Sequence, residues 1–509
     1  MIEWTGGYWA EAETIDDDFF MKYNVTIGME VHAELKTESK MFCACKNGLG
    51  LEKEPNVHIC PVCTAQPGTL PVPNRRAIEA VQCVGLALGC TLRLHSKFDR
   101  KHYFYPDIPK GYQISQYDEP FCEKGAMGIG DMAFRVTRIH LEEDTGKSMH
   151  PYGADYTLVD FNRAGVPLME LVTEPDFSTG KDASLFCQKL RQILRYLDVS
   201  DADMEKGQMR CEVNISLYPE GADPLSGTKV EVKNINSFRS VERAVEYEIK
   251  RQTEALEAGE KIAQETRGWD EAKNATVSQR KKESAHDYRY FPEPDIPPFR
   301  FTPEYVERLR SSLPELPDAK LTRFVAEYAL PEADAIILTE DRELSAYFEA
   351  AASELAAQIK TKEISAPFAR AVKLAANYTL TELRKHLSEN EQRIGDVLIT
   401  PENYAEFIGI VADGKINSSA AQTVLAEMYK GGDNDPSHII ERLNLAQVSD
   451  ISELESVVAG VLAANAKSAA DYKAGKQNAL QFLMGQVMSA TKGKANPKVI
   501  LELLRKHLI

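Results

Sequence analysis

The sequence contains no apolar run long enough to cross a bilayer, which excludes the common kind of helical membrane protein. Its first residues, Met1 to Asp18, are acidic and lack the basic start and apolar centre of a signal peptide. We therefore expect a cytoplasmic protein without membrane contact. Residues 1–20 are interpreted as an N-terminal extension ahead of the folded chain.

Cysteine is scarce, net positive charge is absent, and no phosphate-binding loop is present. Nine cysteines in 509 residues, an odd number, argue against a disulfide framework and for reduced thiols. The formal net charge of −17 argues against non-specific coating of DNA, although a local basic patch is still compatible with it. The Gly-Lys-Ser sequence at Gly146 lacks the first glycine of a phosphate-binding loop. A composition of 43% hydrophobic and 27% charged residues is that of an ordinary globular protein. At 509 residues the chain is long enough for several domains.

The segment from Tyr23 to His32 alternates strictly and predicts a half-buried strand. Its apolar residues Ile27 and Met29 point one way, and Glu30 and His32 point the other. Two residues apart on one strand, this carboxylate and this imidazole could hold one divalent cation between them. An ordinary exposed sheet face would show the same pattern.

Two close cysteine pairs follow, Cys43 with Cys45 and Cys60 with Cys63, separated by a loop rich in glycine and proline. Two such pairs can fold onto one tetrahedral zinc ion, because each short pair supplies two thiolates from a tight turn. Since four thiolates leave no open position, the zinc would be structural. The alternative is four buried thiols without a ligand. The other cysteines lack partners at ligand spacing and are expected in the core: Cys83, Cys90, Cys122, Cys187 and Cys211.

Between Lys97 and Gln116, basic residues are interleaved with aromatic ones. This mixture suits phosphate contacts combined with stacking on a base. A solvated loop over an aromatic core is the simpler interpretation, and the run alone favours it.

Arg135 to Glu143 is a second strand candidate with two adjacent acids. Glu143 is in phase with the apolar Ile139 and Leu141, whereas Glu142 is in phase with His140. A carboxylate that points into the core is costly unless a cation pairs with it. The sequence therefore favours Glu143 over its neighbour as a metal ligand.

A hairpin is expected from Arg210 to Leu217 and from Thr228 to Asn236, with a dense polar face of both signs. A metal–triphosphate site needs this combination, acids for magnesium and lysines for phosphate oxygens. A solvated face is the alternative. Arg163, in a separate turn, is a candidate anion contact, although a surface arginine is the commoner outcome. The polar face of the hairpin comprises Arg210, Glu212, Asn214, Lys229, Glu231 and Lys233.

A proline cluster that ends at Pro298 marks the clearest domain boundary, and helical spacing dominates afterwards. We expect domains at 21–298, 299–400 and 401–509. From Asn465 to Ile509 the chain has eight basic residues and two acids, 8 − 2 = +6. A basic tail on an acidic protein is where a polyanion is expected to bind, although a solubilising cap would look similar. The basic residues are Lys467, Lys473, Lys476, Lys492, Lys494, Lys498, Arg505 and Lys506.

Several long motifs, in order along the chain, resemble the B subunit of the tRNA-dependent amidotransferases, the GatB family. The similarity runs from about Tyr23 to the C-terminus, where the last motifs resemble a YqeY-like tail. The motifs are Ile27-Gly-Met-Glu-Val-His, Lys97-Phe-Asp-Arg-Lys-His-Tyr-Phe-Tyr-Pro-Asp, Gly111-Tyr-Gln-Ile-Ser-Gln, His140-Leu-Glu-Glu-Asp-Thr-Gly-Lys, Asp160-Phe-Asn-Arg-Ala-Gly-Val-Pro-Leu, Asp287-Tyr-Arg-Tyr-Phe-Pro-Glu-Pro-Asp, Asp471-Tyr-Lys-Ala-Gly-Lys, Gly485-Gln-Val-Met and Lys492-Gly-Lys-Ala-Asn-Pro.

The resemblance implies an α+β fold, an antiparallel-sheet cradle similar to glutamine synthetase, then a helical domain and a tRNA-binding tail. It also implies ATP- and magnesium-dependent phosphorylation of the side-chain carboxylate of Glu-tRNA(Gln) or Asp-tRNA(Asn), followed by amidation with ammonia. Carried over, the catalytic magnesium ligands are Glu30, His32, Glu143 and Glu231. The nucleotide contacts expected beside them are Lys229, Lys233 and Arg163.

The chain shows no amidase constellation, no Gly-rich serine loop with a lysine partner. The resemblance therefore implies a heterotrimer with an amidase (A) subunit that releases ammonia and a small clamp (C) subunit. Two other functions compete with this interpretation. An ATP–magnesium ligase for a small free carboxylate would have no use for the basic tail. A non-catalytic zinc-bearing RNA-binding module would prefer Lys and Arg to acids on its sheet faces.

Overall fold

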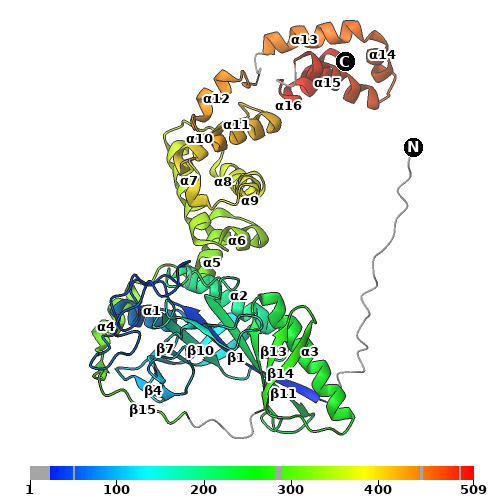
Figure 1. Cartoon of the computed structure of the whole chain (residues 1–509). Coiled ribbons are helices and arrows are strands. Elements are labelled where there is room, and N and C mark those ends of the chain that lie inside the picture. The colour runs from blue at the N-terminus through cyan, green and yellow to red at the C-terminus, as the bar shows by residue number, and fades with distance from the viewer. Residues whose placement is uncertain (1–22, 50–51, 282–287, 448–450, 492–494, 509) are drawn as a thin grey trace. The chain divides into compact units, whose positions relative to one another are not determined.

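The computed structural model describes residues 23–49, 52–281, 288–447, 451–491 and 495–508. The expected extension at 1–20 lies outside these residues, as do Lys492 and Lys494. The chain forms two compact units, Met1–Leu316 and Pro317–Ile509, each described here by itself (Figure 1). No helix among the described residues is both long enough and apolar enough to span a membrane.

Unit 1 is built on a nine-stranded sheet in the order β14-β13-β12-β11-β1-β10-β7-β6-β2. All neighbouring pairs are antiparallel except β12 and β13, which are parallel. Its strands are β1 (Tyr23–Glu34), β2 (Thr91–Leu92), β6 (Cys122–Ile129), β7 (Met132–Glu143), β10 (Pro167–Thr173), β11 (Met209–Pro219), β12 (Val230–Ile235), β13 (Glu265–Asp270) and β14 (Ala275–Lys281).

One face of this sheet is apolar and packs on three helices, α1 (Arg75–Ala87), α2 (Gly180–Tyr196) and α3 (Phe238–Glu257). Ile27, Met29 and Val31 of β1 are at most 1% exposed on this side, as the alternation predicts. Each helix begins after a residue whose side chain accepts a hydrogen bond from a backbone N–H of the first turn. These N-caps are Asn74, Thr179 and Ser237.

Smaller elements complete unit 1. A three-stranded sheet has the order β15-β4-β5, and two two-stranded sheets pair β16 with β3 and β8 with β9. Their bounds are β3 (His95–Ser96), β4 (Asp99–His102), β5 (Tyr112–Ser115), β8 (Lys147–Met149), β9 (Leu158–Asp160), β15 (Phe291–Pro292) and β16 (Phe299–Arg300), with helix α4 (Pro303–Ser311) after them.

Unit 2 is helical and contains two apolar clusters, one from Phe324 to Ile439 and one from Leu454 to Leu508. Its α-helices are α5 (Pro317–Tyr328), α6 (Glu332–Leu338), α7 (Arg342–Lys360), α8 (Phe368–Tyr378), α9 (Arg384–Glu389), α10 (Pro401–Ala412), α11 (Ser418–Lys430), α12 (Pro436–Arg442), α13 (Ile451–Ala464), α14 (Ala466–Lys473), α15 (Asn478–Ala490) and α16 (Pro497–Leu508).

The α+β class, with a mostly antiparallel sheet followed by helices, is confirmed. The domain limits at 298 and 400 stay predictions. The boundary between the compact units falls in the chain between Leu316 and Pro317, and the first apolar cluster of unit 2 includes Ile399 and Tyr404 on both sides of residue 400. The likeness to glutamine synthetase also stays a prediction.

Candidate functional site

The face of the large sheet opposite the three helices is polar at its centre. Strand register determines which side chains meet there, because residues directly opposite on paired strands point to the same face. Glu30 of β1 lies opposite Glu212 of β11, and Asn214, two residues further along β11, lies opposite Glu231 of β12. Three neighbouring strands therefore each contribute one glutamate to one region.

Glu30, Glu212 and Glu231 form a cluster, here called the acidic cluster, in which one carboxylate oxygen from each lies within 4.8 Å of the others. The ammonium of Lys233 lies 2.6 Å from Glu212 Oε2 and 3.4 Å from Glu231 Oε1. The hydroxyl of Thr266 donates to Glu231 Oε2 at 2.7 Å. Three like charges on adjacent strands repel one another, and one lysine leaves an excess of negative charge. Oxygen ligands at this spacing suit Mg²⁺.

A second group of acids and imidazoles adjoins the acidic cluster through Glu30 and is here called the histidine cluster. Glu170 of β10 lies between two imidazoles, since its Oε2 is 3.2 Å from His32 Nε2 and 3.2 Å from His140 Nε2. Glu142 of β7 lies 3.7 Å from His32 Nε2. Ligand atoms of Glu30, His32 and Glu170 lie within 4.8 Å of one another, as do those of His140, Glu142 and Glu170.

The electrostatics reflect this crowding. Burial, with the charges of Glu170 and Glu212, raises the pKa of Glu30 to about 7. Burial alone would lower the pKa of His32, but its hydrogen bond with Glu170 and the surrounding acids raise it to about 9. A divalent cation would neutralise the crowded acids around Glu30, which otherwise share protons or lysines, whereas the raised pKa of His32 reflects its pairing with Glu170. The donor set therefore fits a hard cation.

Glu143 is placed elsewhere. Its Oε2 lies 2.6 Å from Lys110 Nζ, and its Oε1 accepts the backbone N–H of Ile114 at 3.1 Å. Among the described residues it belongs to none of the groups whose ligand atoms lie within 4.8 Å. The structure thus brings Glu30, His32 and Glu231 to one polar face but does not bring Glu143 to them. Its assignment as a magnesium ligand stays a prediction without support from this geometry.

The three residues expected to contact the nucleotide lie in different surroundings. Lys233 lies in the acidic cluster, and Lys229 is exposed just before β12 begins. Arg163 is engaged by the chain itself, since its guanidinium donates to the carbonyls of Thr145 and Gly146 at 3.0 and 2.9 Å. It also lies 3.6 Å from Asp144 Oδ2. An anion would have to compete with these contacts for Arg163.

Sequence reasoning missed Glu212, Glu170 and Glu142 as site residues. Glu212 stands on the predicted polar hairpin face and could have been found by its phase with Asn214. Glu170 is the lone acid in the strand Pro167–Thr173, a signal that the sequence offers weakly. Glu142 was set aside in favour of Glu143, although it shares its phase with His140 and lies in the histidine cluster.

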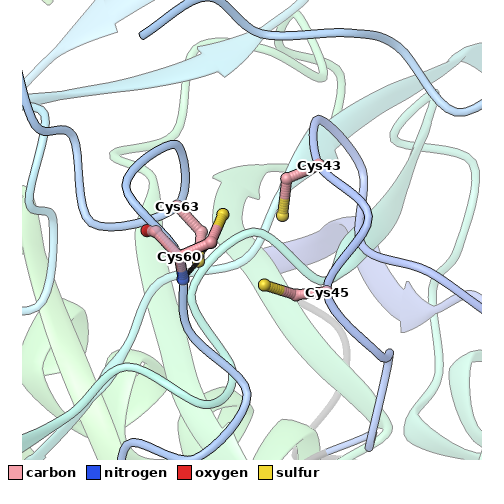
Figure 2. A group of neighbouring side chains, drawn as sticks. All are labelled: Cys43, Cys45, Cys60 and Cys63. Atoms are coloured by element: carbon pink, nitrogen blue, oxygen red, sulfur yellow. Dashed lines mark hydrogen bonds between the residues drawn. The ribbon is translucent and has the colours of Figure 1, made fainter.

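The four predicted zinc ligands meet in loops after β1. The sulfur atoms of Cys43, Cys45, Cys60 and Cys63 all lie within 4.8 Å of one another (Figure 2). Sγ of Cys60 and Sγ of Cys63 are 3.9 Å apart. Four thiolates at about 2.3 Å from a tetrahedral zinc stand about 3.8 Å apart, so this spacing fits a bound ion.

The surroundings of this cysteine cluster favour a thiolate at Cys63, while the hydrogen bond with Cys63 raises the pKa of Cys43 and burial raises the pKa of Cys45 to about 11. A hydrogen bond from the Cys43 thiol lowers the pKa of Cys63 to about 4, with weaker help from the backbone of Cys60. The buried ammonium of Lys40 lies 3.8 Å from Cys63 Sγ. Metal ions bind the thiolate and not the thiol, so the donor set fits zinc. The identity of the ion stays a prediction.

We expect the purified chain to hold about one zinc ion, and Cys63→Ser to lose it and to unfold at a lower temperature. The reason is that the zinc joins two loop segments, one with Cys43 and Cys45 and one with Cys60 and Cys63. Metal content is measured by mass spectrometry of the acid-digested protein, and stability by calorimetry. Cys83→Ser, at a half-buried thiol outside the cluster, is the matched control. Equal zinc content in both variants would contradict the assignment.

Two protein-family models match the chain. The GatB/GatE catalytic domain matches residues 25–307, and the GatB domain matches residues 350–508. Curated relatives are similar to this chain over nearly its whole length. The B subunit of the aspartyl/glutamyl-tRNA(Asn/Gln) amidotransferase of Caldanaerobacter subterraneus subsp. tengcongensis is 48% identical over 492 residues, 96% of this chain and 100% of the relative. The protein of the same name from Dehalococcoides mccartyi is 48% identical over 496 residues, 96% of this chain and 99% of the relative.

Proposed function

The chain belongs to the GatB family of aspartyl/glutamyl-tRNA(Asn/Gln) amidotransferase B subunits, and from this premise we propose how its polar sheet face performs the reaction. It is part of a glutamine-dependent, carbon–nitrogen bond-forming enzyme that acts in translation. We propose that it transfers the γ-phosphoryl group of ATP to the side-chain carboxylate of Glu-tRNA(Gln), Asp-tRNA(Asn) or both, and that ammonia then displaces phosphate.

The chemistry explains why ATP is needed. A carboxylate is a poor acyl donor, because attack by ammonia would have to expel oxide. When the carboxylate oxygen takes the γ-phosphoryl group, ADP leaves, and the acyl phosphate carries inorganic phosphate as a good leaving group. Ammonia then attacks the carbonyl carbon, phosphate departs, and a proton is lost to give the amide. The protein's part is to position the reactants and to neutralise charge.

The acidic cluster is the observation that supports the phosphorylation step. Glu30, Glu212 and Glu231 offer carboxylate oxygens within 4.8 Å of one another, and His32 adjoins them through Glu30. We propose that these residues hold Mg²⁺, which supplies neutralisation of the triphosphate charge when bound. Lys233, already between two of these acids, is a cation placed for phosphate oxygens, and exposed Lys229 adds a second.

We propose that ammonia reaches this site from another chain of the enzyme. The sequence lacks the amidase constellation, a Gly-rich serine loop with a lysine partner, so we expect two partners, an amidase (A) subunit that hydrolyses glutamine and a small clamp (C) subunit. The relatives are named as B subunits, which supports an enzyme of several chains. The cysteine cluster is proposed to hold a structural zinc that is not required for the chemistry.

The test is the mass of the amino acid attached to tRNA after incubation of the assembled enzyme with ATP, glutamine and misacylated tRNA. We expect Glu-tRNA(Gln) or Asp-tRNA(Asn) to become the corresponding amide, which lowers the mass of the attached amino acid by about 1 Da, and ATP turnover to depend on the acylated tRNA. ATP turnover driven by free glutamate alone would instead indicate a ligase for small carboxylates.

A further inference from the structure

Five tyrosines from three separate segments form a contiguous cluster, here called the tyrosine platform: Tyr103, Tyr105, Tyr117, Tyr288 and Tyr290. Tyr103 packs edge-on against Tyr105 and Tyr288, both with ring centroids 6.0 Å away. Tyr288 meets Tyr290 at 6.3 Å, and Tyr290 stacks on Tyr117 at 4.4 Å with an angle of 14° between the rings.

The platform is more open to solvent than an ordinary aromatic core. Tyr117 is 61% exposed and Tyr105 is 55% exposed, although each ring contacts another. Phe104, between Tyr103 and Tyr105 in the chain, is 80% exposed. Tyr117 uses one ring face on Tyr290, and its large exposure leaves surface for a second planar group. Contiguous exposed apolar surface marks interaction sites and ligand-binding grooves, and tyrosine offers a flat ring for stacking.

The platform is connected to the histidine cluster through Lys101 of β4. The Lys101 ammonium lies 5.4 Å from the centre of the Tyr288 ring and 6.0 Å from that of Tyr103. The same ammonium is within the electrostatic influence of Glu142 and Glu170. A ligand that rests on the platform therefore has a cation beside it, and the acids of the histidine cluster, Glu142 and Glu170, lie beyond that cation.

We propose that the tyrosine platform binds an adenine ring, with Tyr117 as the principal stacking surface. The proposal rests on the proposed function, in which two substrates carry adenine: ATP itself and the tRNA, whose 3′-terminal nucleotide is an adenosine. In either case the platform positions the nucleotide so that its reactive end extends past Lys101 toward the acids. Stacking on exposed tyrosines suits this task, because it holds a flat base while leaving the phosphates or the acyl group free.

Tyr117→Ala in the assembled enzyme tests the platform through binding alone. The dissociation constants of ATP and of uncharged tRNA are measured separately by isothermal calorimetry, each with wild type, Tyr117→Ala and Tyr117→Phe. Loss of one base-stacking ring is expected to weaken binding of one of the two by between about 5-fold and about 100-fold. Tyr117→Phe keeps the ring and is expected to recover most of that affinity. Tyr152→Ala, at a fully exposed tyrosine in the β8–β9 hairpin, is the matched control.

A tRNA from which the terminal adenosine has been removed distinguishes the two sources of adenine. If the platform holds the tRNA end, this tRNA binds wild type more weakly but binds Tyr117→Ala as the intact tRNA does. If it holds ATP, only the ATP affinity changes. Unchanged affinity for both ligands in Tyr117→Ala, or equal losses in Tyr117→Ala and Tyr152→Ala, would overturn the proposal. Because no readout depends on turnover, its failure is separate from failure of the proposed amidation.

Discussion

Glu231→Ala is expected to lower tRNA-dependent ATP hydrolysis by the assembled enzyme by at least about 100-fold while leaving tRNA affinity within a few-fold. Glu231 supplies one of three clustered carboxylates. Its loss leaves only Glu30 and Glu212 to hold the metal ion, beside the positive charge of Lys233. A metal ion that neutralises the charge of the triphosphate lowers the activation free energy by several kcal/mol, and losing about that much stabilisation slows the reaction by at least about 100-fold. ATP hydrolysis is measured as phosphate release, and tRNA affinity is measured in parallel, for wild type and Glu231→Ala.

Glu220→Ala is the matched control for this prediction. Glu220 is an exposed acid just after β11, in the turn that leads to β12, so the change in net charge is the same without loss of a clustered carboxylate. We expect its ATP hydrolysis to match wild type. If Glu231→Ala lost tRNA affinity while its ATP hydrolysis persisted, the acidic cluster would be an RNA contact and not a metal site.

Neutralising the exposed basic residues of the tail is expected to weaken tRNA binding and to flatten its dependence on salt. Lys467, Lys473 and Arg505 are exposed on α14 and α16. For each of them that contacts a phosphate, the slope of log affinity against log salt should fall by about 0.7 to 0.9. The triple Gln variant is compared with wild type by filter binding from low to high salt.

Substitution is a cleaner test than truncation here. Deleting the chain from Lys473 onward would also remove Leu480, Leu483 and Ile500, which form much of the second apolar cluster of unit 2. Lys360, Arg370 and Lys373, exposed on α7 and α8, provide a control triple with the same change in charge. An unchanged salt slope in the tail variant, or an equal change in both triples, would show that the basic tail is an ordinary surface.

Local pattern was sufficient for much of the fold. Strict alternation from Tyr23 to His32 predicts β1 and the side of the sheet to which Glu30 and His32 point, because a strand has a fixed period of two. The cysteine spacing likewise predicts that two distant turns meet, since a tetrahedral site needs both pairs. Short-range chemistry determines such features, so a single sequence reveals them.

Glu142 and Glu143 show where this reasoning fails. The parity of β7 separates the two acids correctly, but parity alone does not say which face holds the site. At the end of β7 both faces are covered, since residues 139–143 are all buried. The choice of Glu143 assumed that the acid in phase with apolar residues would need a metal. In the structure Lys110 and the Ile114 backbone satisfy that acid.

Glu170 and Glu212 depend on long-range register and could not be assigned from local pattern. Glu170 reaches His32 and His140 because β10 lies between β1 and β7, although the chain connects these strands in a different order. Glu212 meets Glu30 because β11 pairs with β1 at that register. Such pairings follow from the packing of the whole sheet.

The central claim is that Glu30, Glu212 and Glu231 hold a divalent cation for the activation of a carboxylate. The most direct measurement is anomalous scattering from crystals of the assembled enzyme soaked with Mn²⁺ and a non-hydrolysable ATP analogue. We predict the strongest manganese peak between these three carboxylates, with analogue phosphate oxygens beside it. A peak at Glu143 with none at the acidic cluster, or no bound manganese in this face of the sheet, would contradict it.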